Sequence, residues 1–181
     1  LEFVDIIRPT LEATLQRSRD EPPGYRVAVL ATESAVKSNR YADVLNRYPH
    51  RLDFRQFACP GLAEAVEGKR DATPAELLPA LLAPVNAWGP SLVILACTHY
   101  LHIGEAIRAH LAPGTAILNP AQAVAEAALA YLPWAEVRPD LPVLPSSVAY
   151  WVTEAPTKFQ AQMARLPLGG LPFNEPNLLV C

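Results

Sequence analysis

The stretch Ser91-Leu-Val-Ile-Leu-Ala-Cys97-Thr98-His99-Tyr100 decides the fold of this 181-residue chain. Five apolar residues follow Ser91 and run directly into a thiol, a hydroxyl and an imidazole. A short aliphatic run of this kind is typical of a strand that is buried on both faces of a parallel sheet. In open α/β sheets, ligands bind just beyond the carboxyl ends of the strands. We therefore expect Cys97, Thr98 and His99 to lie at a reaction site.

The segments around this strand alternate between strand and helix patterns. Further strands are expected over residues 26–30, 52–57 and 116–118, with helices between them. This alternation predicts an α/β fold in which a four-stranded parallel sheet is flanked by helices, with right-handed crossovers. Pro79 and Pro84 are expected to kink or divide the helix predicted over residues 73–88, because proline removes a backbone donor and clashes with the preceding turn.

The predicted elements divide the chain into four parts. Residues 1–22 form a helix and a linker, residues 23–132 the α/β lobe, residues 133–166 a strand and a helix, and residues 167–181 a tail. The first and third parts are interpreted as pieces of a second, incomplete lobe. The tail is expected to be poorly ordered, as chain ends without anchoring contacts usually are.

Composition and charge exclude several classes of protein. The formal net charge is −3 and charges of both signs are mixed along the chain, whereas a nucleic-acid-binding protein is expected to carry a basic face. No apolar run approaches the ~18 residues of a transmembrane helix, and the start lacks the basic-then-apolar pattern of a signal peptide. Three cysteines do not suggest a disulfide framework. We expect a cytoplasmic protein with reduced thiols and with neither a nucleic-acid nor a membrane partner.

Parallel strands would bring their carboxyl ends, and the polar groups that follow them, to one edge of the sheet. The residues that carry these polar groups are Thr32, Ser34, Cys59, Cys97, Thr98, His99 and Asn119. Cys59 has no acidic, basic or metal-ligating neighbour, so packing is the better interpretation for it. No metal site is expected, because Cys97-x-His99 is too closely spaced for a usual zinc ligand pair. No glycine-rich nucleotide-binding motif is present either.

Cys97 is the sharpest candidate in this set. A free thiol has a pKa of about 8.5, which a helix N-terminus or a nearby cation lowers. Cys97 precedes a predicted helix and lies two residues from His99, so we expect a lowered pKa that makes a thiolate accessible near neutral pH. A thiolate–thiol couple can act as base and acid for a proton. The alternative is a small buried apolar cysteine at a strand end. The adjacent Thr98 and His99 favour the functional interpretation.

The neighbours of Cys97 each have two interpretations. His99 either polarises the thiol or the substrate, or it caps and packs at the strand end. Thr98 either donates a hydrogen bond to a substrate carboxylate or caps the following helix, whose N-terminus favours an anion. Glu67 orients His99 if its helix faces the same cleft. Considered alone, Glu67 is better explained as part of a solvated helix surface.

Several segments resemble glutamate racemases, in the same order as in that family. Leu92-Val-Ile-Leu-Ala-Cys-Thr-His-Tyr100 resembles the family's second signature, and Ala58-Cys-Pro-Gly-Leu62 with Val66-Glu67 resembles its "ACP…VE" segment. Val27-Ala-Val-Leu-Ala-Thr32 resembles a strand and loop in its second half. The resemblance covers most of the chain and implies a racemase that works without a cofactor.

The resemblance also implies a mechanism and a set of site residues. Two cysteines face the substrate α-carbon from opposite sides, so that one removes the α-proton and the other returns a proton. Cys97 would be one of this pair, His99 would assist it beside Glu67, and Thr98, His99 and Thr32 would contact the substrate. The partner would be glutamate, the product D-glutamate for peptidoglycan, and the full-length parent a homodimer.

The segments that carry the family's other catalytic cysteine and its Asp-Ser-Gly motif do not occur here, and Cys59 does not fit that role. Leu1 resembles a point well inside a full-length racemase. We therefore expect a fragment that lacks the N-terminal part and does not racemise on its own. Two alternatives stay open, namely another amino-acid racemase of the same superfamily and a non-catalytic lobe that binds a small carboxylate.

Overall fold

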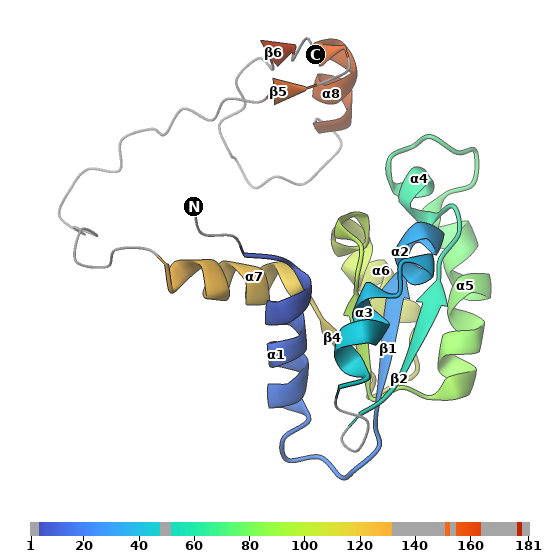
Figure 1. Ribbon diagram of the computed structural model, residues 1–181. Coiled ribbons are helices and arrows are strands. Elements are labelled where there is room, and N and C mark those ends of the chain that lie inside the picture. The colour runs from blue at the N-terminus through green and yellow to red at the C-terminus, as the bar shows by residue number, and fades with distance from the viewer. Residues whose placement is uncertain (1–3, 48–51, 132–150, 153–154, 164–176, 179–181) are drawn as a thin grey trace, which may run out of the picture. The chain divides into compact units, whose positions relative to one another are not determined.

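The computed structural model describes residues 4–47, 52–131, 151–152, 155–163 and 177–178 (Figure 1). The chain forms two compact units, Leu1–Leu132 and Pro133–Cys181. The first unit contains every candidate residue of the predicted site.

The first unit is built on a parallel sheet of four strands in the order β2-β1-β3-β4 (Figure 1). The strands are β1 (Tyr25–Ala31), β2 (Leu52–Ala58), β3 (Leu92–Leu95) and β4 (Ala116–Leu118). All four residues of β3 are buried, as its aliphatic sequence predicts for an inner strand. The predicted fold class, an α/β fold with a four-stranded parallel sheet, is confirmed.

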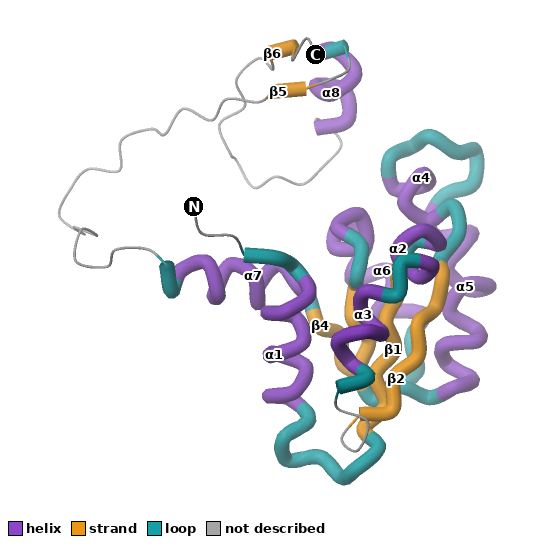
Figure 2. Tube along the Cα trace, in the orientation of Figure 1, coloured by secondary structure: helices purple, strands orange, loops and turns teal. Residues whose placement is uncertain are grey.

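Helices cover both faces of this sheet (Figure 2). Successive side chains of a strand point to opposite faces, so the β1 neighbours Leu30 and Val29 enter different cores. The core around Leu30 includes residues of α4 (Leu62–Val66), α5 (Pro74–Trp88), the 3-10 helix η1 (Thr98–Ile103) and α6 (Gly104–His110). The core around Val29 includes residues of α1 (Ile7–Arg17) and α3 (Arg40–Leu45). Helices α2 (Glu33–Lys37) and α7 (Pro120–Leu129) follow β1 and β4 directly.

Helix α5 is not divided by its prolines, although division was one of the two outcomes expected for it. It runs unbroken from Pro74 to Trp88 with Pro79 and Pro84 inside. Its start carries a full capping box, and its end is closed by Gly89 at φ +70°, so both termini are well satisfied. Both internal prolines are exposed, while a buried stripe of aliphatic residues anchors the helix to the sheet. Tertiary packing of that stripe offsets the lost backbone hydrogen bonds.

The second unit is described only in part. β5 (Trp151–Val152) pairs in parallel with β6 (Asn177–Leu178), and α8 spans Pro156–Met163. The predicted part 133–166, which was expected to contain a strand and a helix, is described only over residues 151–152 and 155–163. Most of the tail 167–181 lies outside the described residues. The assignment of residues 1–22 and 133–166 to a second lobe stays a prediction. None of the helices in the described ranges has the length and apolarity needed to cross a bilayer.

Candidate active site

The candidate site lies at the edge of the sheet where all four strands end. Because the strands are parallel, the residues that follow them meet along this edge. Two backbone hydrogen bonds extend the sheet past its assigned ends. The Cys59 N–H donates to the Ala31 carbonyl at 2.9 Å, and the Ala96 N–H donates to the Leu30 carbonyl at 2.8 Å. Cys59 and Cys97 therefore leave the sheet from strands on either side of β1.

Three of the predicted residues form a continuous line of contacts. Cys97 keeps an extended backbone and the 3-10 turn after it brings His99 back, so that His99 Nδ1 lies 3.6 Å from the Cys97 Sγ. Glu67 arrives from the end of α4 and its Oε1 lies 2.7 Å from His99 Nε2. With the Nε2 proton directed to the carboxylate, Nδ1 is left as an acceptor that faces the thiol. The line Cys97–His99–Glu67 can therefore move a proton between sulfur and imidazole.

Lys69 was not predicted and extends this line. Its Nζ lies 2.6 Å from Oε2 of Glu67, whereas Oε1 of the same carboxylate lies 2.7 Å from His99 Nε2. The signal in the sequence is Glu67-Gly68-Lys69, since a glycine directly after a helix reverses the chain and brings the next residue back toward the helix end.

The ionisation of the site differs from the prediction at Cys97. Burial raises the pKa of the Cys97 thiol, and the carboxylates of Glu64 and Glu67 raise it further, while the backbone N–H groups of His99 and Tyr100 lower it. The expectation that the following helix and His99 lower this pKa is therefore wrong, because burial outweighs the donors of the following turn. The pKa of Glu67 is lowered, chiefly by its hydrogen bond to Lys69 and then by the bond to His99, against the opposing effect of burial.

Cys59 also ends a strand at this edge, where a hydrogen bond with the Tyr100 hydroxyl lowers the pKa of its thiol but burial outweighs that effect. It is 2% exposed and packs in the core beneath α4 and α5. Burial raises the pKa of its thiol to about 12, and the charge of Cys97 acts in the same direction. The Tyr100 hydroxyl donates to the Cys59 carbonyl at 3.3 Å. These contacts agree with the packing interpretation.

The two predicted threonines differ in their surroundings. Thr32 caps α2, as its hydroxyl accepts the Ala35 N–H at 3.3 Å and lies 3.1 Å from the Ser34 hydroxyl. It also lines a cavity of about 310 Å³ with Cys59. Thr98 is exposed at the first position of η1, whereas Cys97 occupies the cap position. Substrate contacts of both threonines stay predictions.

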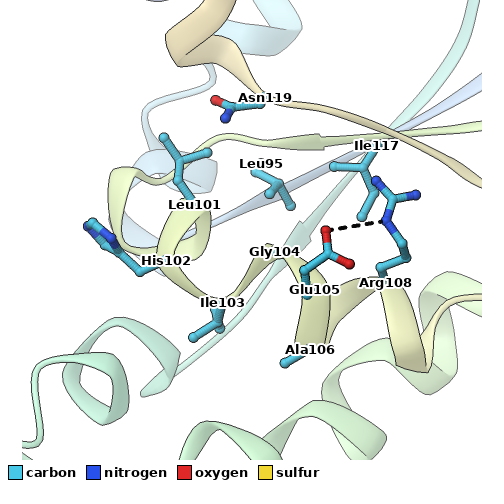
Figure 3. A pocket seen from close by; sticks show the side chains of 10 residues that line it. All are labelled: Leu95, Leu101, His102, Ile103, Gly104, Glu105, Ala106, Arg108, Ile117 and Asn119. Atoms are coloured by element: carbon cyan, nitrogen blue, oxygen red, sulfur yellow. Dashed lines mark ion pairs between the residues drawn. The ribbon is translucent and has the colours of Figure 1, made fainter. Parts of the chain in front are cut away.

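Asn119 follows β4 but lines a different hollow from Thr32 (Figure 3). Its side chain accepts the Ala121 N–H at 2.9 Å and so caps α7. The cavity beside it has a volume of about 420 Å³ and includes the ion pair between Glu105 and Arg108 at 3.8 Å. Figure 3 shows Asn119 across this hollow from the ion pair. Asn119 also lines a second cavity of about 310 Å³ beside α1 and α7, and Thr32 lines neither of these two cavities.

No group of three His, Cys, Asp or Glu side chains within the described ranges is placed to hold a metal ion.

Residues 3–128 match the family described as Asp/Glu/Hydantoin racemase. The chain belongs to this racemase family. The family assignment confirms the resemblance predicted from the residues around Cys97 and Glu67.

Known members of the racemase family align along nearly the whole chain. A glutamate racemase of Gloeothece citriformis is 28% identical over 174 residues, which make up 95% of this chain and 59% of that protein. Two solved structures share the fold. A glutamate racemase isoform of Bacillus anthracis has a TM-score of 0.78 and 22% identity, and the match covers 98% of this chain and 64% of that one. The glutamate racemase of Francisella tularensis in complex with D-glutamate has a TM-score of 0.75 and 17% identity, and the match covers 98% of this chain and 63% of that one. The chain therefore spans less than two thirds of these relatives.

Proposed function

We propose that this protein is part of a glutamate racemase that interconverts L- and D-glutamate without a cofactor, in the cytoplasm, and supplies D-glutamate for peptidoglycan. The observation that carries the proposal is the line Cys97–His99–Glu67 at the sheet edge of a chain that belongs to the racemase family. The relative from Gloeothece citriformis is named a glutamate racemase, and the Francisella tularensis structure contains D-glutamate.

In the proposed reaction Cys97 transfers the α-proton on one face of the substrate. As a thiolate, its sulfur forms an S–H bond while the α-carbon–hydrogen bond breaks, and the electron pair passes into the substrate carboxylate. In the reverse direction the Cys97 thiol gives its proton to the α-carbon. A raised pKa serves both roles, because it makes the thiolate a stronger base and keeps the thiol protonated when it must act as an acid.

His99 and Glu67 supply the proton path of Cys97. The His99 Nδ1 atom, 3.6 Å from the sulfur, accepts the thiol proton and leaves a thiolate beside an imidazolium. The Glu67 carboxylate at 2.7 Å stabilises that imidazolium and holds the ring in orientation. Thr98, exposed beside the thiol in the chain, and Thr32 are proposed to hold the substrate carboxylates through their hydroxyl groups.

Racemisation needs a second thiol on the opposite face of the α-carbon. Cys59 is unsuited to that role, because it is 2% exposed and its pKa is raised to about 12. Cys181 lies outside the described residues, and the segment that carries the family's other catalytic cysteine does not occur in this sequence. We therefore propose that the 181 residues on their own exchange the α-proton of one enantiomer without inverting it.

The test follows bound glutamate by two measurements on the same chain. Proton NMR in D₂O reports loss of the α-proton signal, and circular dichroism reports inversion. Exchange that requires Cys97, without inversion, supports the proposal. Inversion by this chain at ordinary enzyme rates would contradict the single-thiol mechanism.

The same measurements separate the alternatives. Binding of glutamate with no exchange in either wild type or Cys97→Ala would favour a non-catalytic carboxylate-binding lobe. Exchange of aspartate in preference to glutamate would instead favour another racemase of the superfamily. Cys97→Ser is the matched variant, since it keeps the size of the side chain but replaces the thiol by a much weaker acid.

A further inference from the structure

Glu67 is held at both oxygens of its carboxylate. Oε1 lies 2.7 Å from His99 Nε2, and Oε2 lies 2.6 Å from Lys69 Nζ. The Glu67 side chain is 27% exposed, whereas that of Lys69 is 58% exposed. The carboxylate therefore lies between the imidazole of the site and an ammonium group on its solvent side.

The end of α4 explains why Lys69 lies beside Glu67. The Gly68 N–H donates to the Ala65 carbonyl at 3.1 Å, and the Lys69 N–H donates to the Glu64 carbonyl at 2.8 Å. This pair of bonds is the Schellman closure of a helix, with Gly68 at φ +70° in the left-handed region that glycine adopts without strain. The chain reverses at Gly68, so Lys69 is fixed by the backbone next to the residue that it contacts.

The charges around Cys97 show what the ammonium group does there. The titratable groups that interact with the thiol are His99 and Tyr100 from η1, Glu64 from α4, Glu67 at its C-terminal cap, and Cys59 from the end of β2. Both carboxylates disfavour a negative charge on sulfur and raise the pKa of the thiol. Lys69 offsets the charge of one of them through a direct contact.

We propose that Lys69 is a positioning residue for Cys97, which fixes the Glu67 carboxylate against His99 and offsets its charge so that the thiol can release its proton. The role in racemisation rests on the function proposed above. The effect on the thiol is a property of the folded chain and does not require substrate.

The test measures how fast Cys97 is alkylated by iodoacetamide between about pH 7 and pH 10, with the modified cysteine identified by peptide mass spectrometry. Only the thiolate reacts, so the rate reports the ionised fraction of the thiol. We expect Lys69→Gln to slow alkylation about threefold below the midpoint and to move the pH profile to higher pH, as the loss of a partly exposed charge partner does. Lys69→Arg keeps the charge and the donors and is expected to restore the wild-type profile.

Two further variants make the test specific. Arg8→Gln removes the same charge from α1, which packs on the opposite face of the sheet, and is expected to leave the profile unchanged. In a Glu67→Gln background, Lys69→Gln is expected to have less than half of its effect, because its partner is gone. Circular dichroism confirms that each variant is folded.

An unchanged profile in Lys69→Gln would overturn the proposal, and so would a failure of Lys69→Arg to restore the rate. A full effect of Lys69→Gln in the Glu67→Gln background would show that the lysine acts on the sulfur directly and would also overturn it. Because no substrate is present, these results stand whether or not the chain exchanges the α-proton of glutamate.

Discussion

Cys59 and Cys97 follow strands on either side of β1 and reach the same edge of the sheet, yet their surroundings differ. Cys59 is buried in the core and its pKa is raised to about 12, whereas Cys97 is half-buried and contacts an imidazole. The turn that follows each strand makes the difference. After Cys59 the chain enters α4 through Gly61 at φ +73°, and after Cys97 a 3-10 turn brings His99 back to the sulfur. The position at a strand end therefore does not by itself create a reactive thiol.

The largest expected difference between the two thiols is their accessibility to a reagent. Under native conditions we expect iodoacetamide to modify Cys97 at least about a thousandfold faster than Cys59, because Cys59 becomes exposed only when the core opens and its thiolate is scarce. Peptide mass spectrometry measures the two rates in one sample. In denaturant the two rates should converge. Comparable alkylation rates of Cys59 and Cys97 in the folded protein would contradict the expected difference in their accessibility.

The second prediction tests the chemistry of Cys97. We expect Cys97→Ala to reduce exchange of the glutamate α-proton by at least about a hundredfold, since a positioned acid or base contributes on that order or more. Proton NMR in D₂O measures the exchange, and thermal unfolding checks that the variant is stable. Retained exchange in a folded Cys97→Ala protein would assign the proton transfer to another group.

Part of this contrast could be predicted from the sequence. The aliphatic residues of β3 predicted a buried strand, and strand direction alone brought Cys59 and Cys97 to one edge, because these features depend on local patterns. The contact between Glu67 and His99 depends on two side chains 32 residues apart, so the residues alone left it as the weaker of two interpretations and the family resemblance favoured it.

Two features of the site were not predicted correctly, for identifiable physical reasons. The pKa of Cys97 is raised rather than lowered, because its ionisation depends on burial and on the carboxylates of α4, which are tertiary features that sequence neighbours do not reveal. Lys69 was missed because its role depends on the geometry of a helix end rather than on a residue type.

The raised pKa of Cys59 is expected to make the stability of the fold depend on pH. The folded pKa of Cys59 lies at about 12, above its usual value near 9, so above that usual value the unfolded chain loses a proton that the folded chain retains. The stability contributed by Cys59 is therefore complete below about pH 9 and is lost as the pH rises toward about 12. Between these pH values the free energy of unfolding of wild type is expected to fall by up to about 1.4 kcal/mol per pH unit more than that of Cys59→Ala. Urea unfolding at a series of pH values measures the difference, and parallel curves for the two proteins would contradict the assignment.

The smallest expected effect concerns the tyrosine that links the two strand ends. Tyr100 follows Cys97 in η1, is fully buried, and donates its hydroxyl to the Cys59 carbonyl at 3.3 Å. Tyr100→Phe removes this bond but keeps the ring, so we expect a loss of about 1 kcal/mol in the free energy of unfolding. Tyr131→Phe is the matched control, because Tyr131 is 48% exposed and is expected to change stability little. Urea unfolding compares the two variants.

Since the bond joins the turn after β3 to the residue after β2, Tyr100→Phe should also speed alkylation of Cys59 more than that of Cys97. Equal acceleration of both thiols would show instead that the hydroxyl stabilises the fold as a whole.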